Sequence, residues 1–375
     1  MPASRLSSAC ALFAAVCITS CGVARRPPTL PAIRPRASTT FLVVGDIMLA
    51  RGVAAVIERS GDPRRPFSGM SDVLHSVAFA FGNLESPFSA RAQSSPSANR
   101  LIFGAPSDAL SGLIDAGFKV LNLANNHALD QGSAGLRHTA RLLDENAIQH
   151  VGAGSDLDQA WQPAIVTANG IRIAFVGASY ASLNDVGAAR NPFVARIEDR
   201  ARLRRALAGL RARADFVVVT MHAGNEYTHR PNQAQIDFAH AAIDAGADLV
   251  VGAHSHWVQT FESYNGKPVF YGLGNFVFDQ DWSRETTHGL ALRVRLAKPN
   301  GAASATLERI ELLPVIIEQA STPRLTTESE GRTILQDAGL DGLGGMIGGR
   351  RKRGTNAGQS AMAVSTATGS NDNQR

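Results

Sequence analysis

Short apolar runs alternate with amphipathic stretches along most of the chain, and this alternation predicts its secondary structure. The runs are rich in β-branched residues and apolar at nearly every position, which is typical of strands buried on both faces. Strands are expected at Phe41–Gly45, Val77–Gly82, Lys119–Ala124, Ile171–Gly177, Phe216–Met221, Asp248–Gly252 and Val269–Gly272. Helices are expected at Ser107–Ala116, Ser133–Asn146, Ile197–Arg213 and Gln233–Ala245.

The order of these elements predicts an α/β fold, because alternating strands and helices build a sheet that is covered by helices. Two later segments, Leu290–Leu296 and Ala305–Ile317, have the apolar character of strands and are expected to pair in antiparallel fashion. Neither a repeat nor a break in composition divides residues 41–338, so we expect a single domain there.

The first 20 residues have the pattern of a bacterial secretory signal. Arg5 is followed by an apolar stretch that ends at Ile18, which is too short for an ordinary membrane span. The segment closes with Ile-Thr-Ser-Cys, which resembles the lipobox whose cysteine is lipidated in bacterial lipoproteins. We therefore expect Cys21 to anchor the mature chain in the cell envelope; the alternative is a simple cleaved signal. Gly22 favours the outer membrane, with the domain facing the periplasm.

Two flanking segments are expected to lack a packed core. Residues 21–40 combine four prolines with arginines, a composition that favours an extended linker. Residues 339–375 are rich in Gly, Ser, Thr and Asn and contain almost no large apolar side chain, so we expect a disordered tail.

The net charge of +5 and the isoelectric point near 9.4 come from these flanking segments. The first 40 residues carry +5 and the residues from 339 onward carry +3, which leaves −3 on the predicted domain. A mildly acidic domain offers no basic face, so we expect no nucleic-acid partner. All three cysteines lie within the first 21 residues, which excludes a disulfide or a thiolate metal site from the domain.

Potential metal ligands directly follow several of the apolar runs. Ligands of open α/β sheets bind at the carboxyl ends of the strands, so these side chains are expected to converge. A single histidine or aspartate after a strand is more often structural, and only the combination indicates a site. Carboxylate, amide and imidazole groups without thiolate suit Mn, Zn, Fe or Mg. The set comprises Asp46, Glu85, Asn126, His127, His222, His254 and His256.

Six motifs contain or adjoin these residues and occur in order between residues 41 and 282. They are Gly45–Leu49, Gly82–Pro87, Ala124–Gly132, His222–Tyr227, Gly252–His256 and Tyr271–Phe276. Together they resemble the motifs of the CapA family of capsule synthesis proteins, which is associated with poly-γ-glutamate production and related to calcineurin-like metallophosphoesterases. The resemblance implies a metallophosphatase-like αββα sandwich with one or two divalent metal ions.

The resemblance also implies a role for each candidate residue. It would place Asp46 and His256 on a first metal and Glu85 between the two metals. The second metal would be held by Asn126, His222 and His254. His127 would act as a general acid or stabilise an oxyanion. Further polar candidates for contacts to these groups or to substrate are Asn83, Asn125, Asp130, Glu226 and Asn275; the alternative is that such residues form turns and caps.

Two positions depart from the metallophosphoesterase pattern. Met48 stands where that pattern has a histidine ligand, and Glu85 is one methylene longer than the usual bridging aspartate. Three functions therefore remain open. The chain could be a metal-dependent hydrolase or transferase acting on an anionic polymer, a non-catalytic component that works with other polymer-synthesis proteins, or a periplasmic metallophosphoesterase.

Overall fold

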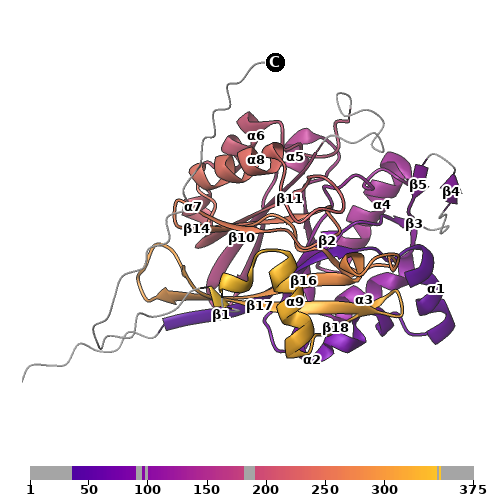
Figure 1. Ribbon diagram of the computed structural model, residues 1–375. Helices are drawn as coiled ribbons and strands as arrows, with labels where there is room; N and C mark the ends of the chain where they lie inside the picture. The colour runs from indigo at the N-terminus through magenta and orange to yellow at the C-terminus, as the bar shows by residue number, and fades with distance from the viewer. Residues whose placement is uncertain (1–35, 90–94, 98–99, 181–190, 344–345, 348–375) are drawn as a thin grey trace, which may run out of the picture. The chain divides into compact units, whose positions relative to one another are not determined.

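The structure is a computed structural model that describes residues 36–89, 95–97, 100–180, 191–343 and 346–347. Two sheets face each other at its centre (Figure 1). The larger sheet has the order β18 (Thr322–Leu325), β17 (Thr306–Glu318), β16 (His288–Pro299), β1 (Arg36–Ile47), β2 (Ala80–Leu84), β7 (Phe118–Asn122) and β8 (Gln149–Val151). In addition, β15 (Asn275–Val277) pairs with β1, and β19 (Met346–Ile347) pairs with β17.

The smaller sheet lies on the other side of the central core. Its order is β13 (Phe261–Tyr264), β14 (Lys267–Phe270), β12 (Leu249–Ala253), β11 (Phe216–His222), β10 (Ile171–Ser179) and β9 (Ala164–Ala168). Neighbouring strands from β10 to β14 run parallel, and the two outer strands are antiparallel to their neighbours. Two short pairs stand apart: β3 (Phe88–Ser89) with β6 (Ala105–Pro106), and β4 (Ser95–Ser97) with β5 (Arg100–Ile102).

Side chains alternate between two cores along the central strands. Phe41 and Val43 pack between the sheets, whereas Leu42 and Val44 pack on the outer side of the larger sheet. Successive side chains of a strand point to opposite faces, so both faces of β1 are buried. This double burial explains why the strands read as continuous apolar runs rather than as alternating ones.

Helices cover the outer face of each sheet (Figure 1). The larger sheet is covered by α1 (Arg51–Ser60), α2 (Ser71–His75), α3 (Leu110–Asp115) and α4 (Gly132–Glu145). The smaller sheet is covered by α5 (Leu157–Ala160), α6 (Arg200–Leu207), α7 (Leu210–Arg213) and α8 (Gln233–Asp244). The order of layers is helix, sheet, sheet, helix, which confirms the αββα sandwich and the single domain predicted above.

Some elements differ from the prediction. The helix expected at Ile197–Arg213 is divided into α6 and α7, because Ala208 is extended and Gly209 is left-handed with a φ of 76°. The helices α1 and α9 (Glu328–Asp337) were not predicted. The pairing of β16 with β17 is antiparallel, as expected.

The ordered domain extends beyond both predicted boundaries. β1 begins at Arg36 rather than at residue 41, because the backbone of residues 36–40 pairs with β16 although their side chains are small or polar. At the other end, the side chain of Leu340 is completely buried. The predicted signal, the lipidation site Cys21 and most of the linker and tail lie outside the described residues. Among the residues described, no helix has the length and apolar character of a membrane span.

Candidate metal centre

The larger sheet brings its candidate ligands together at the carboxyl ends of parallel strands. In the register of β1, Asp46 lies opposite Asn83 of β2 on one side and opposite Asn275 of β15 on the other. Glu85 is the residue after β2. The segment Asn125–His127 follows β7, which is the next parallel strand.

The smaller sheet supplies the remaining histidines from its own carboxyl ends. His222 is the last residue of β11, and His254 and His256 follow the adjacent parallel strand β12. Both histidines have left-handed backbones, with φ values of 92° for His254 and 54° for His256. Non-glycine residues rarely adopt such values, and they cluster at functional sites where surrounding contacts hold them.

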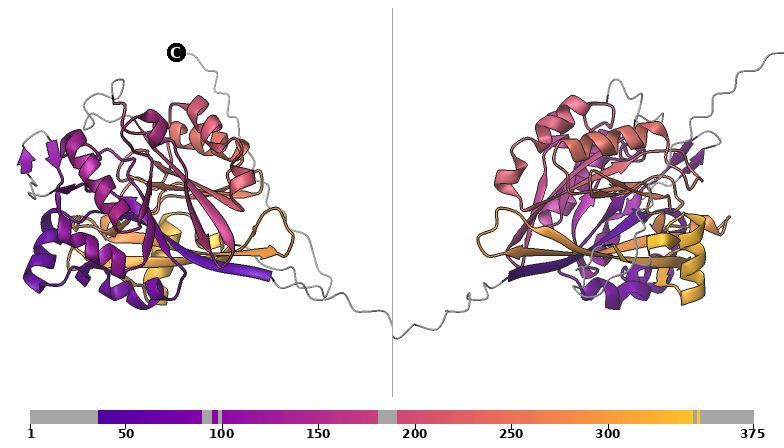
Figure 2. Two further views of the ribbon diagram at one scale, coloured as in Figure 1. Left: turned by 180° about the vertical axis from the view of Figure 1, so that it is seen from behind. Right: turned by 60° about the vertical axis from the view of Figure 1, so that its left-hand side comes forward.

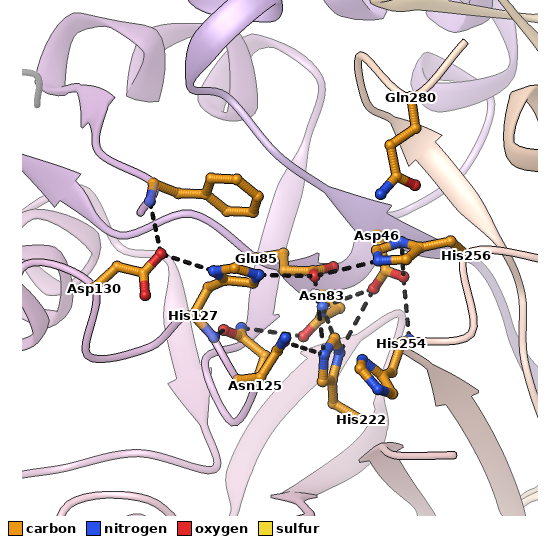
Figure 3. Close-up of polar contacts among 12 residues, drawn as sticks. Asp46, Asn83, Glu85, Asn125, His127, Asp130, His222, His254, His256 and Gln280 are labelled. Carbon is orange, nitrogen blue, oxygen red and sulfur yellow. Dashed lines mark hydrogen bonds and ion pairs between the residues drawn. The ribbon is translucent and has the colours of Figure 1, made fainter. Parts of the chain in front are cut away.

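Glu85 occupies the middle of the cluster (Figure 3). Its Oε1 lies 3.9 Å from the Nε2 atoms of His127, His222 and His256. The carboxylate is completely buried, yet neither of its oxygens accepts a hydrogen bond within the described residues. Potential ligand atoms of Glu85, Asp46 and His222 lie within 4.8 Å of one another.

Asn83 connects the two sheets through its side-chain amide. Its Nδ2 donates to Asp46 Oδ1 at 2.7 Å and lies 3.1 Å from His222 Nδ1. Its Oδ1 accepts a hydrogen bond of 2.9 Å from Asn122, a residue that was not predicted to belong to the site. Asn122 lies inside a buried strand, and an amide at such a position was the signal in the sequence that could have identified it.

His127 is fixed from two directions. Its Nδ1 lies 2.7 Å from Asp130 Oδ2, which also accepts a 2.6 Å hydrogen bond from the backbone of Phe103. The ring of Phe103 stacks on the imidazole with the centroids 3.9 Å apart. The guanidinium of Arg51 lies 4.7 Å from the centroid of the Phe103 ring and 5.9 Å from the centroid of the Phe278 ring. His127 therefore directs Nε2 towards Glu85.

The other predicted ligands are also held by neighbours. Asn126 Oδ1 lies 2.8 Å from His222 Nε2, and Asn275 Oδ1 lies 2.9 Å from His256 Nδ1. The backbone N–H of His254 donates to Asp46 Oδ2 at 3.1 Å. Within the described residues, the buried Nδ1 of His254 has no hydrogen-bond partner.

Burial determines the protonation of the cluster. It raises the pKa of Asp46, and together with the negative charge of Asp46 it raises the pKa of Glu85 well above its ordinary value. It lowers the pKa of His222 and His254 well below the ordinary value, and the neighbouring imidazoles add to this effect. Burial also lowers the pKa of His256. The imidazoles of His222, His254 and His256 are therefore neutral and able to bind a metal, while the positive charge of Arg51 offsets the raised pKa of Glu85 only in part.

The remaining sequence candidates take more varied positions. Asn125 shapes the turn after β7, since it donates to Leu84 O at 2.8 Å and accepts from the backbone of His127 at 3.1 Å. Glu226 lies on the exposed loop after β11, from where its negative charge raises the pKa of Glu85. Met48 is buried in the core beneath the helices and accepts a contact of 3.1 Å from the backbone N–H of Ala50.

The donor set fits a divalent cation. Asp46 and Glu85 form no ion pair with Lys or Arg among the described residues, and the imidazoles of His222 and His256 lie 3.7–3.9 Å from these carboxylates. A positive ion there would supply counter-charge. Candidate oxygen and nitrogen ligands at the strand ends of an αββα sandwich are the arrangement implied by the resemblance to metallophosphoesterases.

The family follows from sequence comparison. Residues 40–280 match the model of the bacterial capsule synthesis protein family PGA_cap, and the chain belongs to this family. The capsule biosynthesis protein CapA of Bacillus anthracis is 31% identical over 341 residues, which cover 88% of this chain and 80% of that protein. The PGA biosynthesis protein CapA of Bacillus subtilis is 33% identical over 300 residues, with coverage of 80% and 77%.

A solved structure can also be superimposed on the chain. The calcineurin-like phosphoesterase YfkN of Bacillus subtilis covers 83% of this chain and 99% of its own, with a TM-score of 0.49 and 12% identity.

Proposed function

We propose that the chain is a metal-dependent hydrolase or transferase that acts on an anionic capsule or poly-γ-glutamate-type polymer in the cell envelope. The observation that carries this proposal is the buried carboxylate of Glu85, which has no hydrogen-bond partner within the described residues and lies 3.9 Å from three imidazole nitrogens. The choice of polymer in this proposal follows from family membership, since the relatives are named for capsule and PGA biosynthesis.

One or two divalent ions, of Mn, Zn, Fe or Mg, would be held by residues of both sheets. The ligands would be Asp46, Glu85, Asn126, His222, His254 and His256. When bound, such an ion polarises an ester, amide or phosphoryl oxygen and makes water more acidic. The hydrogen bond from Nδ1 to Asp130 orients the ring of His127 and leaves Nε2 free to hold or release a proton beside Glu85.

The surroundings of the cluster favour an anionic substrate. The guanidinium of Arg51 lies close enough to lower the pKa of His256, and its buried Nε has no partner among the described residues. Arg51 pairs with Asp279 through one amino group only. Tyr227 stacks near His256 and contacts Trp282, which is 60% exposed. A guanidinium paired with Asp279 and two exposed aromatic rings thus lie beside the cluster.

A second candidate function is a non-catalytic component of a polymer assembly that includes other synthesis proteins. Met48 favours it, because a methionine at this position leaves the first metal position without one imidazole. The same feature weighs against a general phosphoesterase. In both functions Cys21 would be the lipid anchor, and the domain would face the periplasm from the outer membrane.

The test compares His127→Ala and Asp130→Asn with His75→Ala, which alters an exposed histidine at the end of α2. Bound metal is measured by elemental analysis, and γ-glutamyl polymers and phosphoesters are offered with each divalent ion. We expect kcat to fall by about 10²–10⁴-fold in His127→Ala and by about 10–100-fold in Asp130→Asn, with metal content and the His75→Ala control unchanged.

Three results discriminate between the candidates. Metal binding without turnover of any substrate would eliminate the enzyme and leave the assembly component. Turnover that survives in His127→Ala would show that the proton donor is another group. A chain that retains no divalent ion would refute the metal centre itself.

A further inference from the structure

A groove of about 780 Å³ lies at the end of the sandwich opposite the metal centre. β1 passes through both regions, and its first residues extend beyond the end of β2 while they stay paired with β16 (Figure 2). Thr39 lines the groove and Asp46 lies in the metal centre, so the two regions are roughly 23 Å apart at 3.3 Å per strand residue. The groove is therefore separate from the candidate metal site.

One wall of the groove is an unpaired edge of β1. Pairing with β2 starts at Leu42, so the earlier residues of β1 pair only with β16 on the other side. Thr40 O accepts from Ala78, and Leu42 N donates to Phe79, at 2.8 and 3.0 Å, so alternate residues direct their backbone groups to this side. The same alternation directs the N–H and C=O of Ser38 into the groove.

The facing wall is the outer edge of β9, which is the last strand of the smaller sheet. There the side-chain amide of Gln149 pairs with both backbone groups of Ile165, each at 3.0 Å. Thr167 is the next residue of β9 with the same orientation as Ile165, so its backbone groups also point away from β10. The side-chain amide of Gln149 thus makes the two hydrogen bonds that a neighbouring strand would make with Ile165. An amide of a bound chain could make the same two bonds with Thr167.

The lining of the groove is cationic. Lys119 and Arg295 are its charged side chains, and none of the fifteen lining residues is acidic. Arg295 forms a partly exposed ion pair with Glu308 through Nε at 3.1 Å, and Lys119 has no ion pair among the described residues. Thr39 is 3% exposed, and its hydroxyl has no hydrogen-bond partner among the described residues. The groove therefore combines backbone edges that bind amides with cations that bind carboxylates.

We propose that this groove binds an extended polyamide chain that carries carboxylate groups. Its amides would hydrogen-bond to the edges at Ser38 and Thr167, and its carboxylates would lie near Lys119 and Arg295. The choice of γ-linked polyglutamate as this chain rests on the proposed function. The chain's own residues 22–35 are a poor occupant, because they carry three arginines and no acidic residue and would be repelled.

The experiment measures binding of a fluorescent γ-linked glutamate decamer to the full-length protein by polarisation. EDTA is present, so that failure of the metal-dependent function does not affect the result. We expect saturable binding that weakens with salt and falls by about tenfold in the double variant Lys119→Gln, Arg295→Gln. The control Arg59→Gln removes an exposed charge of α1 outside the groove and should leave the affinity unchanged.

Two further arms test the amide contacts. Thr167→Pro removes one outward N–H from an edge strand, a position that tolerates proline, and should weaken binding while the far-ultraviolet circular dichroism stays the same. A polyacrylate of equal length carries carboxylates without amides and should bind more weakly than the decamer. Absence of saturable binding, equal affinity of the double variant, or equal affinity of polyacrylate would each overturn the proposal.

Discussion

At the residue scale, burial makes ionisation of the Glu85 carboxyl group unfavourable in the metal-free chain. Burial and the charge of Asp46 raise its pKa from the ordinary value of 4.5. A group whose pKa is higher in the folded state stabilises the fold at pH values below 4.5, and this contribution is lost as the pH rises towards the folded-state pKa. At neutral pH the buried negative charge of Glu85 should therefore lower the free energy of unfolding of the metal-free protein.

We predict that Glu85→Gln removes this penalty. In EDTA, the variant should match the parent chain near pH 4 and become more stable than it above pH 4.5, by about 1–3 kcal/mol, because a neutral amide is less costly to bury than an unpartnered carboxylate. An excess of divalent metal should reverse the order, since about 2.7 kcal/mol of stabilisation is expected at a hundredfold excess over Kd.

Denaturant unfolding at several pH values provides the measurement. Glu58→Gln, an exposed change on α1, is the matched control and should follow the parent chain. A variant that is less stable than the parent chain at every pH in EDTA would contradict the electrostatic account.

At the element scale, the position of His254 depends on close contact between strands. A Cβ at Gly252 of β12 would lie 1.9 Å from the carbonyl oxygen of Tyr271, which is backbone and cannot rotate away. We predict that Gly252→Ala costs about 1–3 kcal/mol of stability and also weakens metal binding, because the strand end that carries His254 must move.

Thermal unfolding and metal titration check this prediction. Gly342→Ala is the control, since a Cβ there meets nothing within 4 Å, and its stability should stay within about 0.5 kcal/mol of the parent chain. If Gly252→Ala has the same unfolding temperature and the same metal affinity as the control, the contact with Tyr271 does not position the site.

Strand positions were the most predictable part of the fold, because a strand buried on both faces has apolar residues at nearly every position. The start of β1 was not predictable in this way, since its first residues are small or polar and are ordered by backbone pairing with β16. The division of α6 from α7 depended on the conformation of Gly209, which a helical apolar pattern does not reveal.

The candidate site was predictable where polar residues directly follow strands. Its residues converge, but they come from two sheets and not from the rim of one. Arg51 and Asn122 were missed because their roles arise from contacts with distant residues, namely Asp279 and Asn83. The complete burial of Met48 in a hydrophobic core likewise became visible only in three dimensions.

At the scale of the whole molecule, the proposed anchor can be tested without reference to the metal. We predict that Cys21→Ser moves the protein from the detergent phase to the aqueous phase in a phase-partition assay, because lipid chains provide the attachment. Cys17→Ser is the matched control, since Cys17 lies inside the predicted signal and should leave partitioning unchanged. Retention of Cys21→Ser in the detergent phase would refute the lipoprotein assignment.

The single strand β1 links Thr39 of the groove with Asp46 of the metal centre. Because a strand is a stiff spacer, a polymer that engages both places gains avidity only above a threshold length. An α-linked chain extended at about 3.4 Å per residue would need roughly seven residues to span the direct separation. A γ-linked chain has two more backbone carbons in each residue and needs fewer residues. The molecule would then distinguish long chains from short fragments by length alone, without recognising either terminus.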